Sequence, residues 1–134
     1  MPTLTRWLVK TSLIMLIAGL ALGVYLHLPG VSTAALFPLY LHLLTFGWLT
    51  QLILGIALWM LPKYTLEQPR GDERLNWLIY ICLNLGLGLR VLFEPLPPTA
   101  LPPWRGLGLV AAALLQWLAG MLFILQAWPR VKGR

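Results

Sequence analysis

Four long apolar segments dominate the chain, separated by short stretches rich in charged residues, proline or glycine. They cover approximately residues 8–28, 35–62, 75–93 and 104–128. A helix rises ~1.5 Å per residue, so about 20 apolar residues cross a ~30 Å hydrocarbon core. The pattern predicts an all-α protein with a single membrane domain over residues 1–134: an integral membrane four-helix bundle of up-down-up-down topology.

The connections between the segments support this topology. The link after the first segment is short, holds Pro29-Gly30 and lacks charged residues, which predicts an antiparallel hairpin. The stretch EPLPPTALPPWRG at 94–106 contains five prolines. Because proline lacks a backbone N–H and disfavours helix, we expect this stretch to form an extended cap at one end of the bundle.

Composition and charge fix the class and orientation of the protein. Hydrophobic residues make up 59% of the chain and charged residues 10%, far from the balance of a soluble domain. The formal charge of +6 comes from basic residues near the ends of apolar segments, which indicates the positive-inside rule rather than nucleic-acid binding. Of the ten Lys and Arg residues, eight fall on one predicted side. We therefore expect both termini to be cytoplasmic, with the lipid bilayer as a partner. In a Gram-negative bacterium the opposite side would be periplasmic, which corresponds to a multi-pass protein of the bacterial inner membrane.

The second apolar segment carries the most informative pattern. Residues 36–62 contain no Asp, Glu, Lys or Arg, but they do contain His42. A row of small and polar residues at helical spacing should admit a neighbouring helix: Gly47, Gln51 and Gly55. The opposite side is predicted to carry His42, Phe46, Leu49 and Ile53. An imidazole inside a membrane helix is costly to bury, so His42 is the first candidate for a functional or metal-binding residue.

Three further residues are candidate site residues. His27 and His42 lie toward the same membrane face, with His42 ~9 Å deeper by helical rise, so joint ligation of one metal would be strained. Arg90 has Glu94 at i+4, which fits either a snorkelling arginine with a local ion pair or an anion-binding guanidinium. Arg105 stands at the same predicted external end. The single Cys82 excludes an internal disulfide and a cysteine-based zinc or iron–sulfur site within one chain.

The stretch HLLTFGWLTQLILGIALWMLPK at 42–63 resembles the metal-bearing helix in subunit I of haem-copper oxidases, in the branch of the C-type oxidases and nitric oxide reductases. In that helix a His-x-His pair precedes a Gly-Trp, and His42 and Gly47-Trp48 match the spacing of the second histidine. The resemblance implies haem b with His42 as axial ligand, in a helix that enters from the external side. Arg90 or Arg105 would then face the propionates.

The departures from that family limit the function. Tyr40 stands at the position of the first histidine, and the chain has only two histidines in all. One chain therefore cannot carry the complete oxygen-reducing centre, and enzymatic turnover is left open. The sixth iron ligand would be His27, a second His42 across a homodimer, or nothing, which leaves a five-coordinate iron.

Two functions of different class follow. The first is a haem-b membrane protein for electron transfer, or for gas or haem handling. The second is a non-catalytic accessory or structural subunit that packs through its glycine-lined helices against a larger respiratory or photosynthetic complex.

Overall fold

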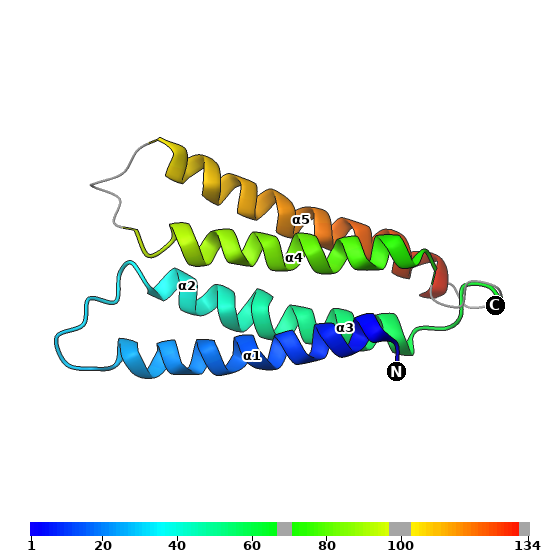
Figure 1. The fold of residues 1–134 in the computed structure, drawn as a ribbon, viewed down its shortest axis with the longest axis horizontal. Coiled ribbons are helices and arrows are strands. Elements are labelled where there is room, and N and C mark those ends of the chain that lie inside the picture. Colours follow the sequence, from blue (N-terminus) through cyan, green and yellow to red (C-terminus); the bar gives the residue numbers. More distant parts are fainter. Residues whose placement is uncertain (67–70, 97–102, 132–134) are drawn as a thin grey trace.

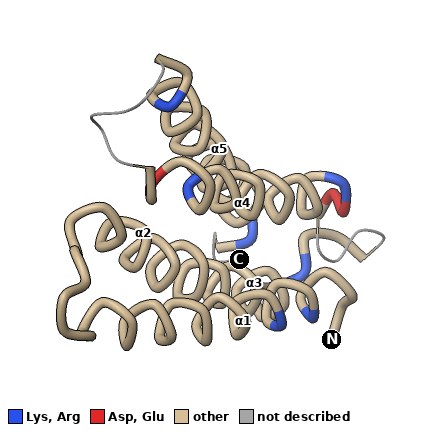
Figure 2. The backbone as a smooth tube through the Cα atoms, turned by 60° about the vertical axis from the view of Figure 1, so that its left-hand side comes forward, with Lys and Arg blue, Asp and Glu red and all other residues tan. Residues whose placement is uncertain are grey.

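The computed structural model describes residues 1–66, 71–96 and 103–131. Their helices are α1 (Thr3–Leu26), α2 (Phe37–His42), a π-helical segment η1 (Leu43–Thr50), α3 (Gln51–Met60), α4 (Glu73–Phe93) and α5 (Trp104–Val131). Because α2, η1 and α3 follow one another without a break, they form one continuous helix over Phe37–Met60, here called the second span. In Figure 1 and Figure 2 α4 lies between the second span and α5.

The described residues thus form four helices that are each long and apolar enough to cross a membrane. This confirms the predicted all-α class and a multi-pass membrane protein. The helix ends differ slightly from the expected ranges: α1 begins at Thr3 rather than about residue 8, and the second span ends at Met60. The central part of the expected proline-rich cap, 97–102, lies outside the described residues.

The start of α4 shows how local sequence sets a helix boundary. Gly71 has a positive φ of 73°, which residues other than glycine rarely adopt, and Asp72 follows as the N-cap. The Asp72 carboxylate accepts a hydrogen bond of 2.8 Å from the backbone N–H of Arg74. This bond satisfies one of the N–H groups that a helix start leaves without an intrahelical partner.

Close approach of α1 to the second span depends on glycine. A Cβ added to Gly47 would lie 2.9 Å from Cβ of Met15, and one added to Gly55 would lie 2.9 Å from Cβ of Leu8. The predicted role of this glycine row is therefore confirmed, and the neighbouring helix is α1 of the same chain. Along the second span the partner position on α1 falls as the residue number rises, so the two helices pack antiparallel.

The π-helical segment changes which side chains share a face. Leu49 and Ile53 are exposed on the outside of the bundle, whereas His42 and Phe46 face α4. The prediction that these four residues line one side was therefore wrong. An ordinary helix advances 100° per residue, but an i→i+5 segment contains more residues per turn. Residues before and after η1 therefore do not share the helix face that uniform α-helical spacing predicts for them.

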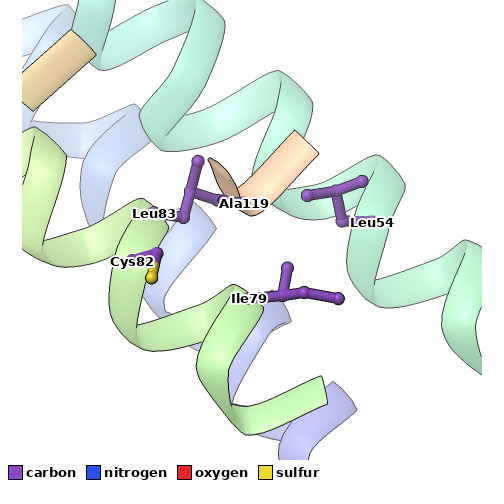
Figure 3. Close-up of a cluster of buried hydrophobic side chains, with 5 residues drawn as sticks. All are labelled: Leu54, Ile79, Cys82, Leu83 and Ala119. Carbon is purple, nitrogen blue, oxygen red and sulfur yellow. The ribbon is translucent and has the colours of Figure 1, made fainter. Parts of the chain in front are cut away.

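The largest cluster of buried side chains lies where α3, α4 and α5 meet. Figure 3 shows its members: Leu54, Ile79, Cys82, Leu83 and Ala119. Ile79 and Ala119 have no solvent-accessible surface at all. Because lipid tails are as apolar as these side chains, the cluster holds the helices by close packing rather than by exclusion of water.

Polar side chains tie the helices together inside this apolar frame. Gln51 is fully buried, and its Nε2 donates to Thr11 Oγ1 on α1 and, at 3.3 Å, to Asn84 Oδ1 on α4. Asn84 thus accepts an interhelical hydrogen bond, as a polar side chain in the middle of an apolar helix usually does. At one end of the bundle Arg130 of α5 donates to three main-chain oxygens at the end of the second span, those of Leu58, Leu61 and Pro62.

Candidate functional site

The candidate site is centred on Glu94, the residue that follows α4. Glu94 is only 6% exposed, and its Oε1 accepts a 2.8 Å hydrogen bond from Nη1 of Arg90, one turn earlier. The same oxygen lies 2.9 Å from Nδ1 of His42 on the second span. The site therefore joins two helices that are adjacent in space but 52 positions apart in sequence (94 − 42). Figure 2 shows the acidic and basic positions together at this end of α4.

His42 presents its two ring nitrogens to different surroundings. Nδ1 is buried against Glu94, although its N–H is not aligned as a hydrogen bond in this arrangement. Nε2 contacts no polar partner among the described residues. The imidazole is partly exposed and lies beside the Phe46 ring, with centroids 6.1 Å apart. Nε2 is thus the nitrogen available to a ligand.

Arg90 is held on two sides within the chain. Its Nη1 donates to Glu94, and its Nε donates at 2.8 Å to Oε1 of Gln116 on α5. The local ion pair with Glu94 is the first of the two interpretations that the sequence allowed. Because Glu94 already compensates its charge, Arg90 is a poor receptor for a further anion.

Two contacts of this site were not predicted from the sequence. Gln116 was not singled out, because a lone amide in an apolar segment gives no hint of its partner. The contact between Glu94 and His42 was also missed. No spacing in the sequence indicates it, because His42 lies inside its predicted apolar segment whereas Glu94 follows the end of another.

Arg105 differs from Arg90 in having free donors. Its Nε donates at 3.1 Å to the main-chain oxygen of Phe93, and no bond from either Nη atom to another described residue is present. Arg105 also borders a cleft of about 440 Å³ between the start of the second span and the α4–α5 pair. The lining residues of this cleft, called the end cleft below, are Ser32, Ala34, Ala35, Pro38, Glu94, Leu96, Arg105 and Leu109.

His27 stands apart from His42. It is exposed beyond the end of α1, with Nδ1 2.7 Å from the main-chain oxygen of Gly23. Tyr40 lies against Gly23, so these two residues are at a similar depth. His27 lies four residues beyond Gly23 toward the end of the bundle, and His42 lies two residues beyond Tyr40 toward its middle. The two histidines therefore differ in depth by about 9 Å by helical rise. Within the described ranges no group of three or more His, Cys, Asp or Glu residues is placed to hold a metal ion.

Comparisons with protein-family models, with curated proteins and with solved structures find no match to this chain. The resemblance to subunit I therefore stays a prediction, carried by His42 and Gly47-Trp48 alone.

Proposed function

We propose that this chain binds haem b through Nε2 of His42, as an inner-membrane bacterial protein of electron transfer or of gas or haem handling. In this proposal the four helices form an up-down-up-down bundle with both termini cytoplasmic. The observation that carries it is the 2.9 Å contact between His42 Nδ1 and Glu94 Oε1. Histidines that ligate a metal usually direct their other ring nitrogen to a carboxylate, a carbonyl or water, which fixes the ring orientation and raises ligand basicity.

The surroundings of His42 fit a haem ligand in two further respects. The Phe46 ring beside the imidazole supplies apolar surface, as the macrocycle requires. Arg105 at the same end of the bundle offers free guanidinium donors for a propionate. Arg90 is less suited to this role, because it already donates to Gln116 and Glu94. When bound, haem would supply the redox-active iron. The residues of this chain would hold it, orient the axial imidazole and tune that ligand's basicity.

The number of axial ligands separates two forms of the site. Because His27 lies at a different depth and is exposed, a single copy supplies one histidine to the iron. The proposal therefore comprises either a five-coordinate haem in one chain or a haem shared by two His42 residues in a homodimer. The first form leaves a coordination position for a small gas, and the second favours electron transfer.

An accessory subunit of a larger complex remains the second candidate, but its docking surface would differ from the one expected from the sequence. Gly47 and Gly55, which the sequence offered to a partner, are covered by α1. Other glycines would have open space for an approaching helix: Gly88, Gly106 and Gly120. This candidate takes first place if the purified protein carries no pigment.

The test is a reduced-minus-oxidised absorbance spectrum of detergent-purified protein made with haem available, together with a pyridine haemochrome assay. We expect a b-type signal of one haem per chain for a single-chain site, or one per two chains for a shared site. His42→Ala should lose the pigment, and the matched variant His27→Ala should retain it. Full pigment retention in His42→Ala would contradict the site assignment.

A further inference from the structure

Two basic side chains lie on the outer face of α1. Arg6 and Lys10 are both exposed, and neither side chain forms a hydrogen bond or an ion pair with another described residue. The helix contains no Asp or Glu that would compensate their charge, and Figure 2 shows basic but no acidic positions along it. Because Arg6 and Lys10 are one turn apart, they share a helix face and repel each other. An anion bound between them would remove this repulsion.

The register of α1 against the second span places Lys10 well inside the end of the bundle. Gly55 lies against Leu8 and Gly47 against Met15, so the numbers of facing residues add up to 62 or 63. Lys10 is therefore level with about residue 53, seven residues (60 − 53) before the second span ends at Met60. By helical rise this depth is ~10 Å.

The depth of Lys10 determines where its ammonium group can lie. The second span contains no charged residue at this level, and a charge is costly in an apolar environment. Side chains on a helix tilt toward its N-terminus, and the long aliphatic stem of lysine lets the charged end reach the membrane surface. The ammonium of Lys10 is therefore directed along α1 toward Arg6, so the two cations converge near the surface.

The same face of α1 is apolar on the other side of Lys10. Residues at the spacing that keeps them in line with Arg6 and Lys10 are all exposed: Leu13, Ile17, Leu20 and Val24. The face thus presents two cations near the membrane surface and an apolar row that runs into the membrane. This order matches a phospholipid, which has a phosphate at one end and acyl chains at the other. A zwitterionic headgroup brings its own cation, whereas an anionic headgroup leaves its negative charge for Arg6 and Lys10.

We propose that Arg6 and Lys10 bind the phosphate of one anionic phospholipid, with an acyl chain along the apolar row from Leu13 to Val24. A carboxylate on a transmembrane helix of another protein would match the depth of Lys10 but would leave Arg6 without a partner. The phosphate accepts hydrogen bonds from both side chains. The site is independent of haem: His42 is level with about residue 21 of α1 by the same register, and the end cleft is at the opposite end of the bundle.

The probe is dioleoylphosphatidylglycerol, and dioleoylphosphatidylcholine, which has the same acyl chains and a zwitterionic headgroup, is the matched lipid. Each is titrated into the detergent-purified chain, and native mass spectrometry measures the bound fraction. We expect the wild type to bind the anionic lipid more tightly. The double variant Arg6→Gln/Lys10→Gln should bind it about tenfold more weakly, the effect of losing charge-assisted hydrogen bonds, with binding of the zwitterionic lipid unchanged.

Two control variants separate this site from general positive charge and from loss of the fold. Arg74→Gln removes an exposed arginine at the start of α4, where Asp72 and Glu73 are neighbours, and should bind the anionic lipid as the wild type does. Lys10→Arg keeps the charge and should also keep the binding.

Three results would overturn the proposal. The first is equal binding of the two lipids by the wild type, and the second is equal binding of the anionic lipid by the double variant and Arg74→Gln. The third is a carbodiimide cross-link in native membranes between Lys10 and a protein carboxylate, which would assign this face to a partner helix. Because none of these readouts involves pigment, failure here is distinguishable from failure of the haem proposal.

Discussion

Nδ1 of His42 lies 2.9 Å from Oε1 of Glu94, and this one contact links the second span to the end of α4. Glu94 is buried, so its charge is tolerable only because Arg90 donates to the same oxygen at 2.8 Å. Three side chains are thus mutually dependent. Their effect on a bound cofactor can be measured separately from their effect on stability.

Glu94→Gln should lower the affinity of the chain for haem by about 10–100-fold, the usual cost of changing a residue that supports a metal ligand. The amide keeps the shape of the side chain but removes the negative charge beside His42. Titration of the haem-free protein with haemin measures the affinity. Glu73→Gln, an exposed acid in the first turn of α4, is the control and should leave the titration unchanged. An unaltered affinity in Glu94→Gln would show that the contact plays no part in haem binding.

Arg90→Met and Glu94→Leu should each destabilise the bundle by about 3–5 kcal/mol, because each leaves the other charge buried without its partner. The double variant should recover most of that loss, since it removes both charges together. Equilibrium unfolding in mixed detergent micelles, followed by circular dichroism, gives the four free energies of the cycle. Strict additivity of the two single losses would mean that the 2.8 Å contact is not an energetic pair.

Gly55→Ala should cost about 1–3 kcal/mol, because the new Cβ would sit 2.9 Å from Cβ of Leu8, an atom fixed to its own helix backbone. Gly120→Ala is the matched control on α5, where nothing lies within 4 Å of the added Cβ. That variant should be neutral or stabilising by up to ~1 kcal/mol, since alanine favours helix over glycine. The same unfolding assay compares the two. Similar effects at both positions would argue against close α1 packing at Gly55.

Arg130→Met should loosen the end of the second span, because the main-chain oxygens of Leu58, Leu61 and Pro62 lose their donor. The bond to the Leu58 oxygen is buried, and a buried carbonyl left without a donor costs about 1–3 kcal/mol. Hydrogen–deuterium exchange should therefore accelerate in the peptide that covers residues 55–62. Arg74→Met removes an exposed arginine on α4 and should leave exchange in that peptide as it was. No change in Arg130→Met would show that these bonds do not hold the helix end.

The sequence predicted the four membrane-length helices because each span needs a long apolar stretch, a signal that hydropathy carries directly. It also predicted the buried row of Gly47, Gln51 and Gly55, since small residues at helical spacing indicate close packing. Arg130 follows the last apolar segment, and hydropathy gives no sign that its side chain binds the end of the second span. That contact depends on three-dimensional arrangement, as does the pairing of His42 with Glu94.

The π-helical segment Leu43–Thr50 lies directly after His42 and before Gln51. The number of residues in η1 therefore sets the rotation of His42, which precedes it, relative to Gly55, which follows it and packs on α1. Deleting one residue within η1 would turn His42 by about 100° relative to Gly55. Single-residue insertions and deletions here would therefore be far more damaging than most substitutions, and the length of this segment is itself a determinant of the site.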